Sequence, residues 1–131
     1  SGVAGVIKNT EGAIGYLNYG YVNGGKFQQV ALQNRAGNFV KANSETSAAG
    51  LAKIVLDDKL RGADPNPAGA NAYPIVSLTW ILAYPESAPG VKETLRYMLS
   101  EKSQGISDSL GYVPLPESLR QKSLAAVDSI K

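Results

Sequence analysis

Apolar and polar positions recur along the first part of the chain with periods that predict a helix followed by a strand. Residues 1–9 are predicted to form a helix with one apolar face, and Gly12 is placed to end it in a left-handed turn. Residues 13–19 are predicted to form a strand, because they carry β-branched and tyrosine side chains and no charge. Residues 20–26 are expected to form a turn.

The pattern that follows predicts a hairpin and then a helix. Residues 27–33 and 38–41 are expected to be two strands joined by a tight connection, in which Gly37 takes a positive φ. A helix capped by Asn43 or Ser44 should come next, since both side chains can accept a hydrogen bond from the first turn.

A nearly continuous apolar segment, residues 74–84, is the strongest strand prediction in the sequence. Its pattern is typical of a strand buried on both faces of a sheet. The preceding helix is expected to end near Leu60, and residues 61–73, which are rich in proline and glycine, are predicted to be a loop. Polar side chains interrupt even this longest apolar run, so no segment has the length of a membrane-spanning helix.

The last part of the chain predicts two helices separated by an extended segment. Residues 91–102 have the spacing of an amphipathic helix. Residues 111–116 must be extended, because their two prolines restrict themselves and the residues before them. Pro116 is expected to open a last helix. Its inner face consists of Leu119, Ala126, Val127 and Ile130. Helices that outnumber strands and alternate with them indicate an α/β or α+β fold.

Composition limits the chemistry that the chain can perform. Its 131 residues suffice for one domain with a buried core. The absence of cysteine and histidine excludes disulfides and thiolate zinc sites, and removes the usual general base near neutral pH. The net charge of +2 is scattered along the chain, which does not indicate nucleic acid binding. We expect no cofactor and no metal.

Each candidate motif has a simpler structural explanation. The glycines of residues 2–15 suggest a phosphate-binding loop, but a helix precedes the strand here, which is the reverse of the order such a loop needs. Asp57 and Asp58 are adjacent and would face apart on a helix. No Ser-x-x-Lys order is met around Ser100, so a Ser–Lys hydrolase finds little support. Trp80 could line a sugar or base site, but its apolar strand favours core packing.

Three blocks of sequence resemble the periplasmic phosphate-binding proteins of ABC-type phosphate uptake systems. Residues 2–19 contain Gly-Ala-Ile-Gly-Tyr, residues 72–82 contain Tyr-Pro-Ile, and residues 110–118 contain Gly-Tyr-Val-Pro-Leu-Pro. In that family the first block lies well past the middle of the chain. The resemblance implies an α/β fold, here a partial periplasmic-binding-protein type II fold with pieces of both lobes, and no enzymatic activity.

The resemblance also implies how the chain is divided and where the ligand binds. Residues 1–72 would be part of the second, middle lobe. Residues 73–131 would supply the crossover strand and the C-terminal helices of the first lobe. The family's phosphate motif is a Ser-Gly-Thr loop with an upstream arginine, and no such triplet occurs in this sequence. We therefore expect that motif upstream of Ser1, and no ligand-binding or catalytic residue is carried over.

The implied function is solute capture without catalysis, as the C-terminal part of the phosphate-binding subunit of an ABC-type phosphate transporter. The implied partners are inorganic phosphate, the transporter permease, and an N-terminal half or second chain that completes the fold. The implied location is periplasmic or at the cell surface, and an export signal would be expected at the start of a longer precursor. The alternative is a structural or interaction module that keeps the fold but has lost ligand binding.

A lone apolar strand has unpaired edges, which favour association with another strand. Residues 75–82 would have such edges unless other strands flank them. We therefore expect the fold to be completed by a second polypeptide, by a further part of the protein, or by self-association.

Overall fold

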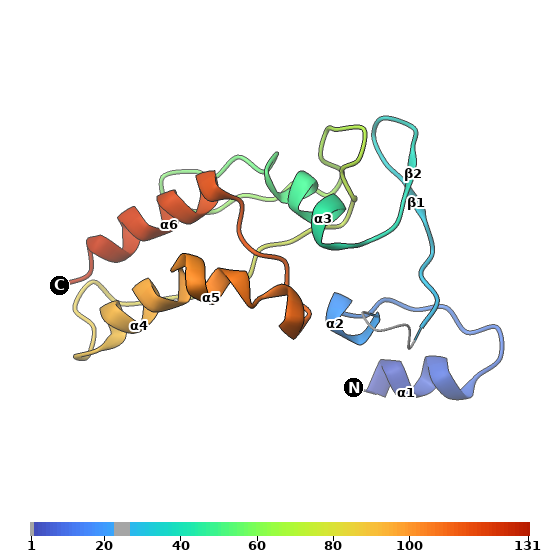
Figure 1. Ribbon diagram of the computed structural model, residues 1–131, viewed down its shortest axis with the longest axis horizontal. Coiled ribbons are helices and arrows are strands. Elements are labelled where there is room, and N and C mark those ends of the chain that lie inside the picture. Colours follow the sequence, from blue (N-terminus) through green and yellow to red (C-terminus); the bar gives the residue numbers. More distant parts are fainter. Residues whose placement is uncertain (1, 23–26) are drawn as a thin grey trace.

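The computed structural model describes residues 2–22 and 27–131, which form short helices and one small sheet. In chain order the elements are α1 (Gly2–Asn9), α2 (Tyr19–Val22), β1 (Leu32–Gln33), β2 (Phe39–Val40), α3 (Ser44–Leu51), α4 (Val91–Met98), α5 (Glu101–Gly105), the 3-10 helix η1 (Asp108–Leu110) and α6 (Glu117–Asp128). Figure 1 shows α4, α5 and α6 grouped at the C-terminal end and α1 and α2 at the opposite end. The expected mixture of helix and strand is present, with few strands.

The predicted hairpin is confirmed, although its strands are shorter than expected. β1 and β2 pair antiparallel, with Leu32 opposite Val40. Gly37 has a φ of 86° and donates its N–H to the Asn34 carbonyl at 2.9 Å, which closes the turn. The left-handed turn predicted at Gly12 is also confirmed, with a φ of 74°. Part of the turn predicted for residues 20–26 lies outside the described residues, and its first residues form α2.

Asn34 fastens the hairpin to the loop that follows α3. Its side-chain amide donates to the carbonyls of Gly69, Ala70 and Ala72 at 3.2, 2.9 and 3.1 Å. Its side-chain oxygen accepts from the backbone N–H groups of Ala36 and Asn38. Asn34 is only 5% exposed, so its side chain has little access to water. These hydrogen bonds take the place of the hydrogen bonds to water that the amide gives up on burial.

The cap predicted at the start of α3 is confirmed, but the predicted length of this helix is wrong. The Asn43 side chain accepts from the N–H of Thr46 at 2.8 Å, and the Thr46 hydroxyl accepts from the backbone N–H of Asn43 at 3.1 Å, which together form a capping box. The helix ends at Leu51 instead of Leu60. Beyond it, Ile54 and Leu56 are buried while Val55 between them is exposed, the alternation with a period of two that extended backbone gives.

The strands predicted for residues 13–19 and 74–84 are wrong in this structure. Both segments are free of regular structure apart from Tyr19, the first residue of α2. Apolar side chains in both are open to solvent: Ile14 is 85% exposed and Leu82 is 97% exposed. A strand forms only when another strand accepts its hydrogen bonds, and no described strand lies beside either segment.

The core lies between α3, the segment after it, and α6. Leu51, Ile54, Leu56 and Leu119 are buried together, and partly buried Val76 and Leu78 pack against them. The predicted inner face of the last helix is confirmed at Leu119 and Val127, which are buried. Ala126 is only partly buried, and Ile130 is buried but lies beyond the end of α6. Pro116 is the N-cap residue of α6, so the helix begins one residue later than predicted, at Glu117.

The helix predicted for residues 91–102 is broken into two. α4 ends at Met98, and Ser100 caps α5 by accepting the N–H of Ser103 at 3.2 Å. The side-chain cap competes with continued helical hydrogen bonding, which explains a break that the apolar spacing does not reveal. α4 then packs beside α6, as Figure 1 shows.

A contact between two glycines joins α2 to the turn that follows η1. Gly111 follows η1 with a φ of 80°, and a Cβ placed on it would clash with Gly20 of α2. A Cβ placed on Gly20 would lie 3.5 Å from the Cα of Gly111. The two backbones therefore approach closely because neither residue has a side chain.

Candidate functional site

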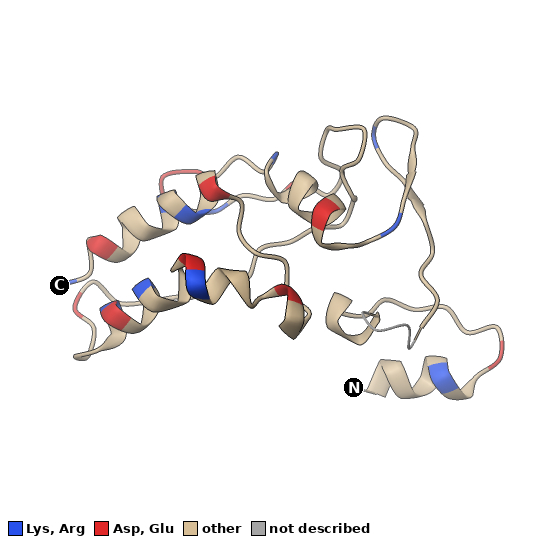
Figure 2. Cartoon of the chain, in the orientation of Figure 1, with Lys and Arg blue, Asp and Glu red and all other residues tan. Residues whose placement is uncertain are grey.

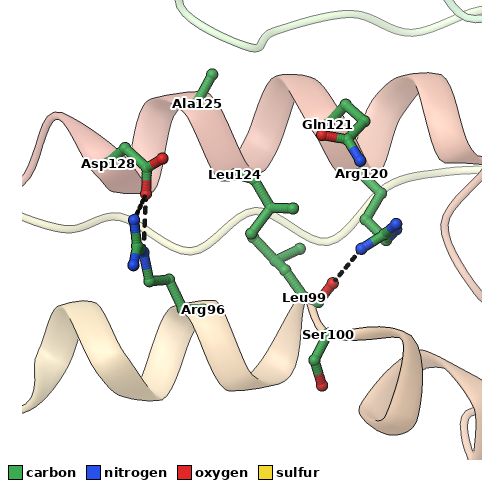
Figure 3. A pocket seen from close by; sticks show the side chains of 8 residues that line it. All are labelled: Arg96, Leu99, Ser100, Arg120, Gln121, Leu124, Ala125 and Asp128. Atoms are coloured by element: carbon green, nitrogen blue, oxygen red, sulfur yellow. Dashed lines mark hydrogen bonds and ion pairs between the residues drawn. The ribbon is translucent and has the colours of Figure 1, made fainter.

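A shallow groove between α4 and α6 is the first candidate for a binding site. Its volume is about 490 Å³, and Figure 3 shows side chains from both helices projecting into it. The lining residues are Arg96, Leu99, Ser100, Arg120, Gln121, Leu124, Ala125 and Asp128. Arginine side chains beside an apolar surface are chemically suited to binding an anion. What the groove can bind therefore depends on whether each guanidinium is free or already paired with a carboxylate.

Arg120 is held by acidic side chains and by a carbonyl. Its side chain is only 10% exposed, and its Nε and Nη2 donate to the carboxylate of Glu117 at 2.7 and 2.8 Å. Its Nη1 donates to the Leu99 carbonyl at 3.1 Å, and Glu101 lies 3.6 Å away. The hydrogen bonds from Arg120, and then from Gln121, hold the pKa of Glu117 below its ordinary value. Glu117 in turn raises the pKa of Arg120.

The basic side chains of α4 are also engaged, at the C-terminal end of α6. Arg96 donates to one carboxylate oxygen of Asp128 through Nε and Nη2, at 2.8 and 2.6 Å (Figure 3). Lys92 donates its Nζ to the carbonyls of Asp128 and Ile130 at 2.9 and 2.6 Å. Cations are favoured at this end of a helix, where carbonyls lack intrahelical partners. These charges fasten α4 to α6, and an incoming anion would have to displace Asp128 or Glu117.

A second cavity, of about 610 Å³, lies beside the turn at residues 57–63. It is lined by Asp57, Arg61, Gly62, Ala63 and Trp80. Arg61 forms an ion pair with Asp57 at 2.7 Å, and the hydrogen bond from its side chain is the main reason that the pKa of Asp57 is lowered. Asp57 thus belongs to a local turn, and the prediction that it lies at the end of a helix is wrong.

The prediction that Trp80 packs in the core is wrong, because its side chain is exposed. Its ring is at the rim of the second cavity, and its Nε1 donates to the Leu60 carbonyl at 2.6 Å. The strand pattern around Trp80 suggested burial on both faces, and only one of those faces meets the core in this structure. The remaining walls are small residues and one ion pair, which do not form a stacking site for a sugar or a base.

Residues 2–22 and 27–131 contain neither a group of metal-binding side chains nor a helix that could cross a membrane. No three acidic side chains there lie close enough together to hold a metal ion. In the same residues, none of the helices combines the length and the apolar character that crossing a bilayer requires.

Sequence reasoning missed the arginines of the groove. The spacing of Glu117 and Arg120 on one face of the last helix is the signal that could have indicated their pairing.

Comparison with known proteins relates the chain to one group. It is 31% identical to the phosphate-binding protein PstS of Methanocaldococcus jannaschii over 99% of its length, and 32% identical to PstS of Xylella fastidiosa over 90%. It is 27% identical to PstS of Haemophilus influenzae over 88%. This chain is a relative of the PstS phosphate-binding proteins. The resemblance seen in the three sequence blocks is therefore confirmed.

The chain spans only part of the PstS proteins that it matches. It covers 38% of the M. jannaschii protein, 36% of the H. influenzae protein and 34% of the X. fastidiosa protein. These proportions are consistent with a C-terminal portion of a PstS protein. No protein-family model matches the chain.

Proposed function

We propose that this chain is the C-terminal part of a solute-binding protein that captures inorganic phosphate outside the cytoplasm and delivers it to the permease of an ABC-type transporter, without catalysis. The observation that supports this most strongly is the extent of the match. PstS proteins of several organisms match between 88% and 99% of the chain, and all of them are phosphate-binding proteins by name.

In this proposal the chain is part of a type II periplasmic-binding-protein fold and contributes to both lobes. Residues 1–72 would belong to the middle lobe, and residues 73–131 would contribute the crossover segment and the final helices of the first lobe. The exposed apolar segments support the proposal that the chain is only part of such a fold, because they have strand patterns but no strand beside them among the described residues.

The phosphate contacts are proposed to lie in the part of PstS that the chain does not match. The state of the groove between α4 and α6 supports this. Arg120 and Arg96 are already paired with Glu117 and Asp128, and Lys92 is bonded to backbone carbonyls. Figure 2 shows basic and acidic residues interspersed on α4 and α6, an arrangement that does not concentrate positive potential on an anion.

Isothermal titration calorimetry with inorganic phosphate tests the proposal. The 131-residue chain alone is expected to give no binding heat. A chimera, in which this chain replaces the matched portion of the M. jannaschii PstS protein, is expected to bind phosphate. Substituting Arg96→Gln in that chimera is the control, and phosphate binding should survive because Arg96 pairs within the chain.

Two results would count against the proposal. Tight phosphate binding by the 131-residue chain alone would place the site in residues that we consider structural. A chimera that folds cooperatively and binds no phosphate would favour the alternative, a module that keeps the fold without the ligand.

A further inference from the structure

The junction between α4 and α5, residues Leu99 and Ser100, interrupts a sequence that favours a single helix. Residues 91–104 contain no proline or glycine, and most of them are strong helix formers. Leu99 has nearly helical backbone angles, with φ −89° and ψ 0°, whereas Ser100 is extended, with φ −68° and ψ 154°. A rotation about ψ of Ser100 therefore separates the two short helices from one continuous helix.

Side chains satisfy the carbonyls that the break leaves without a backbone donor. In a continuous helix, the carbonyls of Met98 and Leu99 would accept from the N–H groups four residues further along. The Met98 carbonyl accepts instead from the side-chain amide of Gln104, at 2.9 Å. The Leu99 carbonyl accepts from Nη1 of Arg120 on α6, at 3.1 Å (Figure 3). Arg120 therefore supplies, from another helix, the hydrogen bond that a continuous helix would form within itself.

Polar contacts, and not apolar burial, decide between the broken and the continuous helix. Neither α4 nor α5 has a fully buried residue. The N–H of Ser103 donates to the Ser100 hydroxyl at 3.2 Å, a bond that a backbone carbonyl would replace in the continuous helix. The Arg120 side chain is only 10% exposed, and the carboxylate of Glu117 holds it in place. The guanidinium is thus fixed beside the Leu99 carbonyl, where it stabilises the broken form.

The junction also sets the position of the turn that touches α2. The backbone N–H of Ser107 donates into α5 at 3.1 Å, and that of Tyr112 donates to the Ser107 carbonyl at 2.9 Å. These bonds tie α5, η1 and Gly111 into one unit, which is joined to α4 through Ser100. Because Gly111 lies against Gly20 of α2, a rotation at Ser100 would move it out of that contact.

We propose that the junction of α4 and α5 is a conformational switch, in which Arg120 holds residues 91–105 as two helices, and its release lets them form one helix that draws Gly111 away from Gly20. Since Arg120 and Ser100 both line the groove between α4 and α6, the switch connects that groove to the contact with α2. The switch is a property of this chain and does not depend on the proposed phosphate function.

The Cα and Cβ chemical shifts of residue 100 measure the switch, because they differ between helical and extended backbone, and relaxation dispersion extends the measurement to a minor state. In the unsubstituted chain these shifts should be extended. Arg120→Met keeps the apolar stem and removes the guanidinium. It should raise the ratio of continuous to broken helix on the order of tenfold, because one hydrogen bond from a charged group is lost. Arg96→Met is the matched control: Arg96 also pairs with a carboxylate of α6 but donates to no carbonyl of the junction, so residue 100 should stay extended.

Ser100→Ala tests the same equilibrium without touching α6. It removes the hydroxyl that accepts from Ser103, and it should favour the continuous helix on the order of fivefold. In both variants the nuclear Overhauser contact between the α-protons of Gly20 and Gly111 should weaken in step with the shifts of residue 100. If residue 100 keeps extended shifts and shows no exchange with a helical state in folded Arg120→Met and folded Ser100→Ala, the proposal is wrong. It is equally overturned if residue 100 becomes helical while the contact between the two glycines persists.

Discussion

Replacing Asn34 by alanine is expected to destabilise the chain more than any other substitution of a polar residue in the hairpin. The side chain donates three hydrogen bonds to the loop after α3 and accepts two from its own turn. Ala72 is 1% exposed, so its carbonyl would lose its only described donor in a place that water does not reach.

The size of the effect follows from these contacts. A buried carbonyl left without a donor costs about 1–3 kcal/mol, and a typical hydrogen bond contributes about 0.5–1.5 kcal/mol net. The carbonyls of Gly69 and Ala70 are only partly buried, so water can replace the amide there. We therefore expect Asn34→Ala to lower the free energy of unfolding by about 2–3 kcal/mol.

Urea titration followed by the fluorescence of Trp80, the single tryptophan, measures this loss. The dependence on urea should be unchanged while the midpoint falls. Asn38→Ala is the matched control, because its exposed amide donates one bond to Ala70, and its removal should cost at most about 0.5 kcal/mol. If the two variants unfold at the same urea concentration, the buried Ala72 carbonyl does not depend on Asn34 and the reasoning fails.

Two further predictions concern a glycine and a carboxylate. Gly111→Ala should lower stability by more than about 1 kcal/mol, because a Cβ there meets Gly20 and the φ is positive. Gly37→Ala is the matched control, because Gly37 also has a positive φ, of 86°, but has open space around it, so this variant measures the cost of the backbone conformation alone. If Gly111→Ala and Gly37→Ala unfold at the same urea concentration, the clash with Gly20 does not contribute. The pKa of Glu117 is depressed in the folded state, so its contribution to stability is present above its ordinary pKa of 4.5 and is lost as pH falls below it. Between about pH 5 and 3, the urea midpoint of Glu117→Gln should therefore decline less steeply than that of the unsubstituted chain. An equally steep decline would show that the pair of Glu117 with Arg120 does not stabilise the fold.

Features set by neighbouring residues could be predicted from the sequence. The Gly37 turn needs a positive φ that glycine supplies, and the Asn43 cap needs only the first turn of its own helix. The inner face of the last helix was likewise evident from the spacing of Leu119 and Val127. The turn and the cap are decided by contacts within a few residues along the chain, and the helix face by the spacing of its own apolar residues.

Features that depend on distant partners could not be predicted. The segment 74–84 has the composition of a strand, but pairing requires a neighbour that no local pattern supplies. The bonds from Asn34 to the loop after α3, and from Arg120 to the Leu99 carbonyl, join residues far apart in sequence. The candidate groove was missed for the same reason, since its two walls come from helices that only packing brings together.

The contact between Gly20 and Gly111 has a mechanical consequence for a two-lobed protein. A contact made by side chains would interlock, so that relative motion would require rotamer changes and would be stepwise. Two bare backbones have no such projections, so a rotation at this contact would not require a side chain to change rotamer. If residues 1–72 and 73–131 serve different lobes, this contact is a smooth pivot that would let the lobes turn about each other without repacking.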